Sequence, residues 1–326
     1  IMAYTTIDKP SDYFNTKLYT GNGSTQTISS VGFQPDWTWI KHRDGATAHM
    51  IFDSVRGALY RLQSNSSNPH TSAANTLTSW NSDGFALGTE NDTNGNTRLF
   101  ASWNWKETAD AGFDIVSYTG NGTAGKTVAH SLSAVPKMII VKRYNDGTAS
   151  WMVYHHTLGN NIYLSLDTTA ASDAGHWDST SPTSSVFSVS GDQRVNNDGA
   201  SYIAYCFSEK QGYSKFGAYI GNGDADGTFV YTGFKPAWFM LKKTSATDPW
   251  LIYDNKRSPI NQVQANLQAN SSNAEVTNTV YLDFLSNGVK FRNTDNDGNL
   301  SGGTYVYMAF AENPFVTSTG VPATAK

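Results

Sequence analysis

The sequence YTGNG occupies residues 19–23 and again residues 118–122, and the near copy YIGNG occupies residues 219–223. The copies begin 99 and 101 positions apart, whereas solenoid and propeller repeats have periods of about 20–50 residues. A period near 100 residues corresponds to one complete β-sandwich. The phrase therefore predicts three tandem units of this kind in one chain.

Other blocks recur after each copy in the same order. A proline followed by an apolar stretch ending in lysine appears as GFQPDWTWIK (32–41), LSAVPKMIIVK (132–142) and GFKPAWFMLKK (233–243). Each unit ends on an aromatic stretch: TRLFASWNWKE (97–107), ASYIAYCFSEK (200–210) or GTYVYMAFAEN (303–313). A continuous apolar run such as 138–141 is typical of a strand that is buried on both faces. Helical periodicity is almost absent, and the best helical candidate is a short stretch at 54–62.

These patterns predict an all-β fold with three tandem β-sandwich repeats of jelly-roll or lectin-like type. The predicted divisions are an N-terminal arm (1–16), repeat one (17–110), repeat two (111–213), repeat three (214–317) and a C-terminal tail (318–326). The linkers between the repeats are short, so the units should pack against one another. The sequence is compatible with two arrangements of the three units, a row and a pseudo-threefold ring.

The repeated Asn-Gly pairs (22–23, 121–122 and 222–223) suit a tight hairpin turn, because its centre needs positive φ angles. A phosphate-binding loop is the alternative. It would need a lysine and a serine or threonine at the P-loop spacing, and these do not follow the glycines. The motif therefore indicates a structural turn.

Composition excludes several classes of function. Only 15% of residues are charged and the net charge is −4, which does not suit nucleic-acid binding. The apolar runs are much shorter than the about 20 residues of a membrane-spanning helix, and the start of the chain has no signal-peptide pattern. The single cysteine, Cys206, excludes an internal disulfide framework and lies in a predicted strand as a structural thiol.

No nucleophile elbow or HExxH motif is present, so the sequence predicts a protein that is not an enzyme, with a polysaccharide hydrolase or lyase as the alternative. Three of the few glutamates, Glu107, Glu209 and Glu312, share one repeat position, which favours a structural role. Asp295 and Asp297 imitate the start of a calcium loop, but its twelfth position is Val306 in place of glutamate. We therefore expect no cofactor, with calcium as the alternative.

Two residue patterns are candidates for ligand binding. An Asp/Arg pair recurs in FDSVRG and YDNKRS; a local ion pair is favoured, and a ligand clamp is the alternative. Tryptophans in polar segments can stack on sugar rings, or they can pack inside the protein. The candidate binding residues are Trp80, Trp105, Trp177, Asp53, Arg56, Asp254 and Arg257.

The blocks YTGNG, VPKMIIVKR and SPTSSVFSVSGDQRVNNDGASYIAYCFSE resemble a phage-encoded family of virion and tail-associated proteins. GFKPAWFMLKK, the start MAYTTIDKPSDYF and the ending GGTYVYMAFAENPFVTSTGVPATA carry the same resemblance. Such proteins occur in marine and environmental bacteriophages. The family has no assigned catalytic residues, so the resemblance implies a structural or appendage protein. Unit one departs most from the pattern, in YRLQSNSSNPHTSAANTLTSW.

The expected function is therefore attachment to a host-surface glycan by a tail fibre or other virion appendage. A capsid decoration or tail-assembly protein is the first alternative, and a polysaccharide depolymerase is the second. The expected partners are other virion proteins and the glycan, without nucleic acid or membrane. The resemblance also implies a homotrimer and a place on the phage particle, after synthesis in the host cytoplasm without a signal peptide.

Overall fold

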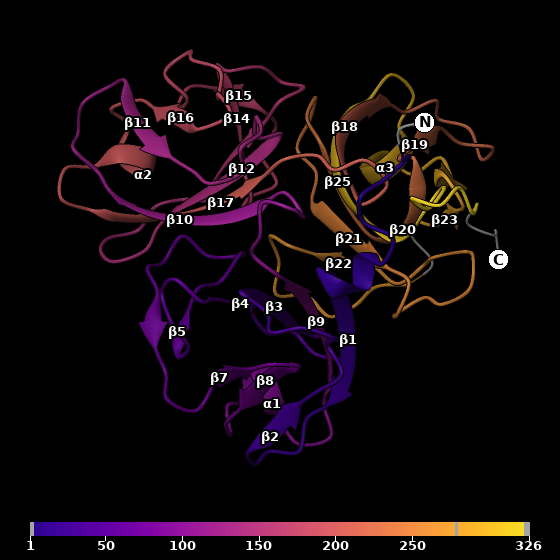
Figure 1. The fold of residues 1–326 in the computed structure, drawn as a ribbon, viewed down its shortest axis with the longest axis horizontal. Helices are drawn as coiled ribbons and strands as arrows, with labels where there is room; N and C mark the ends of the chain where they lie inside the picture. Colours follow the sequence, from indigo (N-terminus) through magenta and orange to yellow (C-terminus); the bar gives the residue numbers. More distant parts are fainter. Residues whose placement is uncertain (1–2, 278–279, 323–326) are drawn as a thin grey trace.

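The protein has an all-β, sandwich-type fold in a computed structural model, which describes residues 3–277 and 280–322. Antiparallel sheets carry almost all of the regular structure (Figure 1). The all-β prediction is confirmed. We call the three predicted repeats unit one, unit two and unit three.

The same order of elements recurs in each unit. Unit one contains β1 (Phe14–Thr20), β2 (Gln26–Ile28), β3 (Trp37–His42), β4 (Met50–Asp53), β5 (Tyr60–Arg61), β6 (Thr71–Ser72), β7 (Leu77–Asn81), β8 (Gly84–Leu87), α1 (Asn91–Asn94) and β9 (Leu99–Trp105). Unit two contains β10 (Phe113–Thr119), β11 (Lys126–Ala129), β12 (Met138–Arg143), β13 (Met152–His155), β14 (Ile162–Ser165), β15 (Asp173–Ala174), β16 (Val186–Val189), α2 (Gln193–Asn196) and β17 (Ser201–Phe207). Unit three contains β18 (Ser214–Ile220), β19 (Phe229–Tyr231), β20 (Phe234–Lys243), β21 (Trp250–Asp254), β22 (Leu267–Gln268), β23 (Leu282–Leu285), β24 (Gly288–Phe291), α3 (Asn296–Asn299) and β25 (Thr304–Pro314).

Each unit has a large sheet and a small sheet. The large sheets have the orders β1-β9-β3-β4, β10-β17-β12-β13-β14-β15 and β18-β25-β20-β21-β22. The first strand of each unit therefore pairs with the last, as Phe14 pairs with Trp105 in β1 and β9. The small sheets have the orders β2-β8-β7, β11-β16 and β19-β24-β23. Figure 1 shows the large sheets toward the centre and the small sheets on the outside.

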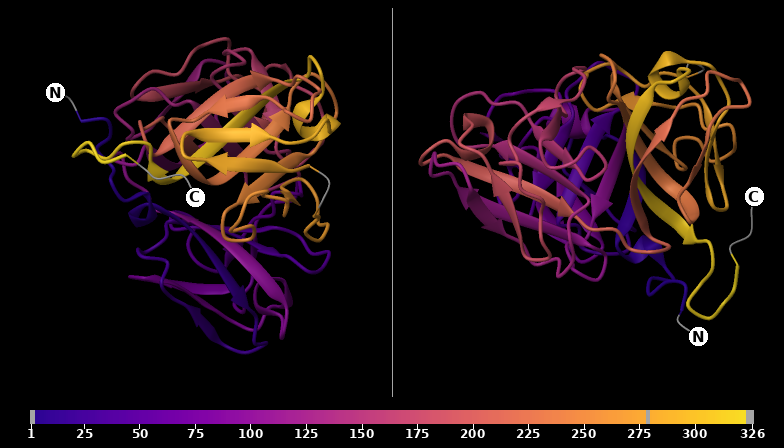
Figure 2. Two further views of the ribbon diagram at one scale, coloured as in Figure 1. Left: turned by 90° about the vertical axis from the view of Figure 1, so that its right-hand side faces the viewer. Right: turned by 90° about the horizontal axis from the view of Figure 1, so that it is seen from above.

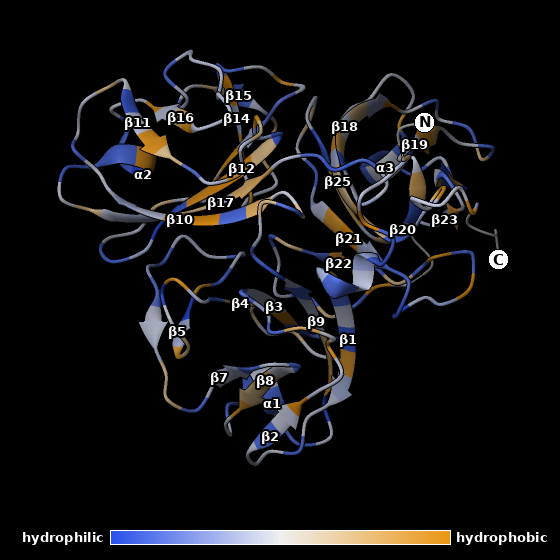
Figure 3. Ribbon diagram, in the orientation of Figure 1, coloured by the Kyte–Doolittle hydropathy of each residue, from blue (hydrophilic) through white to orange (hydrophobic). Residues whose placement is uncertain are grey.

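The largest apolar cluster lies where the three large sheets meet, and all three units contribute to it. Side chains alternate along a strand, so Tyr205 and Phe207 of β17 belong to this shared centre, whereas Ala204 and Cys206 belong to the core inside unit two. Strands β9 and β25 divide their side chains in the same way. Each large sheet is thus buried on both faces, which explains the continuous apolar runs in its strands (Figure 3).

Aromatic rings from different units meet at this centre. The ring centroids of Trp37 and Tyr205, in units one and two, lie 4.6 Å apart. Those of Trp105 and Trp238, in units one and three, lie 5.6 Å apart. Phe207 and Phe310 join units two and three at 6.0 Å. The units therefore form a pseudo-threefold ring and not a row: Figure 1 shows three lobes around this centre, and Figure 2 shows them from two other sides.

The repeated glycine motif joins the two sheets of a unit and does not close a hairpin. Strand β1 pairs with β9, and β2 pairs with β8, so the turn between β1 and β2 carries the chain from one sheet to the other. The expected hairpin is wrong, but the expected positive φ is confirmed. The second glycine of each copy has a φ of 66° or 67°, at Gly23, Gly122 and Gly223.

The other motif residues attach this turn to the short helix before the last strand. In unit one the Tyr19 hydroxyl donates to the Thr93 carbonyl at 2.7 Å. The buried Asn94 side chain accepts from the Asn22 backbone N–H at 3.0 Å and donates to the Gly88 carbonyl at 2.7 Å. The equivalent tyrosines and asparagines make the corresponding first two bonds in the other units: Tyr118, Tyr219, Asn196 and Asn299.

Replacing Gly120, the first glycine of the motif, by alanine is expected to lower the free energy of unfolding by about 1–3 kcal/mol. A Cβ at this position would overlap the backbone carbonyl oxygen of Asn197, which cannot rotate away. Gly159→Ala is the matched control, since Gly159 has a φ of 86° and open space around it. It should cost about 1 kcal/mol from backbone strain alone. Equal losses in urea unfolding would contradict the close-contact explanation.

A short helix precedes the last strand of each unit. In the described part of the chain, α1, α2 and α3 each span four residues just before the last strand of a unit. Asp192 and Asp295 cap α2 and α3 by accepting the backbone N–H groups of Arg194 and Asp297, both at 2.8 Å. The predicted helix at 54–62 is wrong, because this stretch forms a turn followed by β5.

The N-terminal segment lies against unit three. Tyr4 donates its hydroxyl to the Gly233 carbonyl at 2.6 Å, and Thr5 donates to the Gln211 carbonyl at 2.8 Å. A short 3-10 helix (Pro10–Asp12) leads into β1, which begins inside the range predicted for the arm. Within residues 3–277 and 280–322, no helix has the length and apolar character needed to cross a membrane.

Candidate functional site

The two Asp/Arg pairs are buried at contacts between units. Asp53 and Arg56 form an ion pair at 2.6 Å, and the Asp53 carboxylate also accepts the hydroxyl of Tyr205 in unit two at 2.7 Å. Burial opposes the charge on Arg56, but the Asp53 carboxylate outweighs it and raises the pKa of the guanidinium. This pair holds unit one against unit two.

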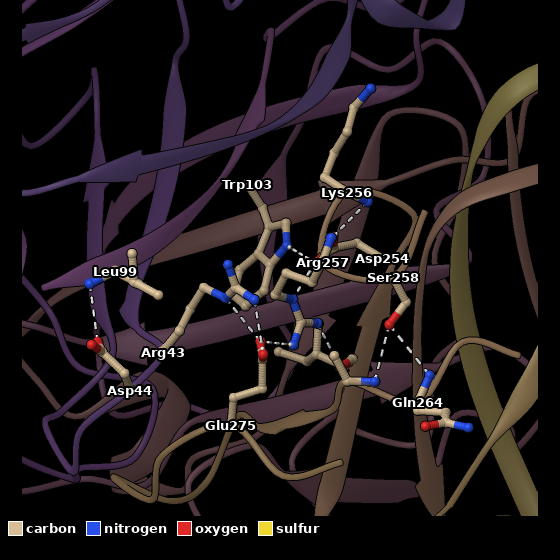
Figure 4. A network of polar contacts seen from close by, with 12 residues as sticks. Arg43, Asp44, Leu99, Trp103, Asp254, Lys256, Arg257, Ser258, Gln264 and Glu275 are labelled. Atoms are coloured by element: carbon tan, nitrogen blue, oxygen red, sulfur yellow. Dashed lines mark hydrogen bonds and ion pairs between the residues drawn. The ribbon is translucent and has the colours of Figure 1, made fainter. Parts of the chain in front are cut away.

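The second pair does the same between units three and one. The Asp254 carboxylate forms an ion pair with Arg257 at 2.5 Å and accepts the indole N–H of Trp103 at 3.0 Å. Glu275 extends the network by contacting Arg257 at 3.1 Å and Arg43 of unit one at 2.9 Å (Figure 4). All four residues of the two Asp/Arg pairs are buried, so in this structure they contact protein and not solvent.

Unit two closes the ring with different residues at the same positions. His155 takes the place of the aspartate, and its Nε2 lies 3.2 Å from the Tyr307 carbonyl of unit three. The residue of unit three that corresponds to Trp103 and Tyr205 is Met308, which has no strong donor to offer an aspartate. The carboxylate is therefore present where the facing strand supplies a donor and is replaced where it does not.

Three buried lysines make a second cyclic set of contacts between units. Lys41 donates to the Ser272 carbonyl at 3.3 Å, Lys142 to Ser67 at 2.9 Å and Lys242 to Thr169 at 3.1 Å. Each lysine thus reaches from its own unit to the next one around the ring. Burial lowers the pKa of all three ammonium groups to about 8. This explains why a lysine follows the apolar residues of the third strand in each unit.

The three candidate tryptophans are not exposed in this structure. Trp105 lies in the shared centre, and Trp177 packs inside unit two against Tyr154, with ring centroids 5.7 Å apart. Trp80 is half-buried and donates its indole N–H to the Thr38 hydroxyl at 3.3 Å. Their packing positions leave no free ring face on Trp105 or Trp177 for a sugar at the surface.

The calcium candidates have other contacts. Asp295 caps α3, and its neighbour Asp297 lies against Asp248. Burial, together with the hydrogen bond and the charge of Asp248, raises the pKa of Asp297 to about 7. Over the described ranges, no group of three or more His, Cys, Asp or Glu side chains is arranged to hold a metal ion.

A polar pocket lies on the outer loops of unit two, and we call it the loop pocket. Its volume is about 370 Å³. Loops around β14, β15 and β16 and the start of α2 form it. The lining residues are Asn161, Ala174, Gly175, His176, Asp178, Ser179, Ser190, Asp192 and Arg194. Its mixture of hydroxyl, amide and charged groups makes it the best candidate for a binding site in the described chain.

His176 is the distinctive residue of the loop pocket. Only 4% of it is exposed, and neither ring nitrogen has a hydrogen-bond partner among the described residues. The nearest acidic atom is Oδ1 of Asp192, 3.6 Å from Nδ1. Burial lowers the pKa of the imidazole to about 4, so the ring is neutral near pH 7 and has one donor and one acceptor.

The loop pocket is bordered by a segment that forms a strand in the other two units. The small sheets of units one and three each have a third strand, β7 or β23, whereas that of unit two consists only of β11 and β16 in the structure as described. The segment from 175 to 185 forms a loop at this place.

The sequence marks Trp177 as a candidate binding residue and its neighbour His176 as a loop anchor. Three non-glycine residues of this loop have positive φ: His176 at 74°, Asp178 at 53° and Ser179 at 50°. Such conformations are unfavourable and occur often at functional sites. The useful sequence signal was the absence of a strand pattern between residues 175 and 185, but the backbone conformation itself leaves no mark in one sequence.

A second cleft, of about 450 Å³, lies in unit three. Its loop is four residues longer than in the other units: Leu267 follows Arg257 by ten positions, whereas Leu62 follows Arg56 by six. Lys235 and Glu312 form an ion pair at 2.6 Å at one side of this cleft. The cleft is lined by both apolar and polar groups, and Oδ1 of the half-buried Asn255 has no hydrogen-bond partner among the described residues.

An acidic pair lies at the junction of units one and two. Glu107 is hydrogen-bonded to Asp114 and accepts the Ile115 backbone N–H at 2.9 Å. Burial and the proximity of Asp114 raise the pKa of Glu107 from 4.5 to about 7. At the junction of units two and three the equivalent Glu209 instead forms an ion pair with Lys215 at 2.7 Å.

Glu107→Gln is expected to stabilise the protein at pH 8 but not at pH 4.5. The folded state holds the Glu107 proton more tightly than the unfolded state, so wild-type stability falls as pH rises from 4.5 to about 7. The amide avoids this loss, and the gain above pH 7 should be about 1–2 kcal/mol after allowing for solvent screening. Urea unfolding at both pH values measures it. Glu209→Gln, which breaks an ion pair, should show no gain at pH 8.

Comparison with known proteins identifies the chain at the level of its family. No curated protein matches it in a sequence search. The family model described as Domain of unknown function (DUF7483) matches residues 9–314, from the N-terminal segment to the end of β25. The match includes all three units, the shared centre and the loop pocket. The chain therefore belongs to the DUF7483 family.

Proposed function

We propose that this protein is a non-catalytic attachment protein of a bacteriophage particle, in a tail fibre or similar appendage, and that its outer loops recognise a glycan on the host surface. The resemblance of the repeated blocks to virion proteins supports the phage context. The proposal places the protein on the particle with other virion proteins as partners.

One observation supports the attachment role: the contacts of the β-sheet framework recur in all three units, whereas the loops differ between units. Equivalent tyrosines, asparagines and lysines make equivalent contacts in all three units. In contrast, the segments after the fourth strand differ in length and in secondary structure between units. Recognition proteins commonly carry divergent loops on a rigid scaffold. An enzyme with three copied active sites would instead show repeated polar residues in those loops.

A contact with another virion protein is the second candidate, and an apolar surface on unit three favours it. Ile220, Phe229 and Tyr231 are 63%, 43% and 53% exposed. Phe229 and Tyr231 alternate with the buried Val230 on β19, so they share its outer face, and Ile220 accepts a hydrogen bond from Thr228 beside them. Large exposed apolar side chains gathered in this way suit a protein–protein interface.

Binding to cells and glycans tests the attachment role. Labelled protein is incubated with a panel of bacterial cells and with an array of bacterial surface polysaccharides. We expect binding to some cells, and we expect periodate oxidation of their glycans to abolish it. Binding to neither cells nor polysaccharides would refute the attachment role. Release of reducing sugar ends would replace it with a depolymerase.

Antibody labelling of virus particles separates the two structural candidates. Gold particles at fibre or appendage tips support attachment, whereas labelling over the capsid surface supports a decoration role. The solution mass, measured by light scattering, shows whether three chains assemble further into a homotrimer. A purified particle that carries no label at all would remove the virion context.

A further inference from the structure

We propose that the loop pocket of unit two is a saccharide site and that it binds a neutral sugar residue. This inference rests on the proposed attachment function and names the place and the ligand class. A saccharide hydroxyl can donate and accept a hydrogen bond at the same time. A ligand with this property suits the loop pocket, because the imidazole of His176 has no hydrogen-bond partner among the described residues.

The first argument is the unpaired imidazole. His176 is almost completely buried, yet neither ring nitrogen has a hydrogen-bond partner among the residues that the structure describes. A buried polar group without a partner destabilises a protein and calls for a specific explanation. Its ring is held in place by Tyr163, whose ring centroid lies 4.1 Å away. A hydroxyl group of a ligand in the pocket would satisfy the donor or acceptor of this fixed ring.

The second argument is the charge of the pocket. Two carboxylates, Asp178 and Asp192, and one guanidinium, Arg194, line it. Arg194 is already engaged by Asp192 through contacts of 3.0 and 3.1 Å, which leaves the Asp178 charge without a lining cation. An anionic ligand such as a uronate or a phosphate would therefore be repelled. A neutral sugar is not repelled, and its hydroxyl groups can donate hydrogen bonds to the carboxylate oxygens.

The third argument comes from the other two units, which serve as internal controls. In units one and three the corresponding segment of the chain forms β7 and β23. In unit two this segment is a loop that keeps His176, Asp178 and Ser179 in left-handed conformations. Such a change in one of three copies is consistent with a gained binding site. The volume of about 370 Å³ lies within the range of about 300–1,000 Å³ that small-molecule sites have.

Small glycosides test this assignment on the full chain. Protein with isotope-labelled histidine side chains is titrated with methyl glucoside, methyl galactoside and methyl mannoside, and separately with glucuronate. The NMR signals of the imidazole rings are followed during each titration. We expect at least one neutral glycoside to shift the His176 signals, and glucuronate to leave them unchanged. No shift with any of the three neutral probes, or an equal response to glucuronate, would overturn the assignment.

Two substitutions in the pocket and one outside it complete the test. His176→Asn should weaken binding of the responding glycoside about tenfold or more, and asparagine tolerates the left-handed backbone. Ser179→Gly should keep the fold, with an unchanged or higher Tm, because glycine adopts positive φ without strain, and it should also weaken binding. His70→Asn is the control. His70 is a half-buried histidine of unit one that stacks on Tyr60 at 4.8 Å, so its replacement should leave glycoside binding unchanged.

The outcomes separate the pocket from the attachment role. If His176→Asn abolishes both glycoside binding and binding to bacterial cells, the loop pocket is the attachment site. If cell binding persists in this variant while the glycosides never shift His176, attachment stands and the pocket assignment fails. A folded His176→Asn protein that binds the glycoside as tightly as wild type also overturns the assignment.

Discussion

A fragment that contains only residues 111–213 is expected to show no cooperative unfolding transition as a monomer. In the whole protein, the inner face of the unit-two large sheet is covered by units one and three, and the fragment would expose that face to water. The exposed side chains would include Ile140, Trp151, Tyr205 and Phe207. Burial of each such side chain is worth about 1.5–3 kcal/mol, so exposure of these four alone would cost about 6–12 kcal/mol, which is comparable to the whole stability of a typical domain.

Circular dichroism during heating, with light scattering for the mass, measures this prediction. The control is the same segment expressed together with two further fragments, 1–110 and 214–326, which should reassemble into a complex that unfolds cooperatively. A fragment that melts cooperatively as a monomer would show that each sandwich is stable by itself. That result would make the shared centre an ordinary contact between independent domains.

Asp53→Ala is expected to lower the free energy of unfolding by about 3–5 kcal/mol. In the described chain the only ion pair of Arg56 is the one with Asp53, so removal of the carboxylate leaves a buried guanidinium without a counter-charge. The Tyr205 hydroxyl loses its acceptor at the same time. Carbonyls of Tyr60 and Ile51 still accept from Arg56, but they carry no full charge.

Two further variants distinguish the stability contributed by the buried charge of Asp53 from that contributed by its hydrogen bond with Tyr205. Tyr205→Phe removes only the hydroxyl and should cost about 0.5–1.5 kcal/mol. Asp254→Ala should cost less than Asp53→Ala, because Arg257 keeps its contact with Glu275 at 3.1 Å. Urea unfolding of the three variants measures these differences. A loss for Asp53→Ala no larger than that for Tyr205→Phe would show that the buried charge contributes little.

Some features of the site were readable in the sequence and others were not. The recurrence of Asp and Arg three positions apart indicated an ion pair, and the structure has that pair. Its partners, Tyr205 and Trp103, come from other units, about 150 positions away, and no local pattern connects them. The loop pocket was also hidden, since His176 has no neighbour in sequence that reveals its unpaired state.

By itself, the sequence determined the all-β class, the repeat and the positive φ angles of the glycine turns. The alternation of apolar side chains and the glycines with positive φ depend on neighbouring residues, and the period near 100 residues is a repetition of the sequence itself, so these features are visible without coordinates. Only the tertiary structure decided that the glycine turns join two sheets, that the three units close into a ring, and that a loop of unit two borders a pocket around His176. Those features depend on which distant surfaces bury one another, and burial is a property of the whole folded chain.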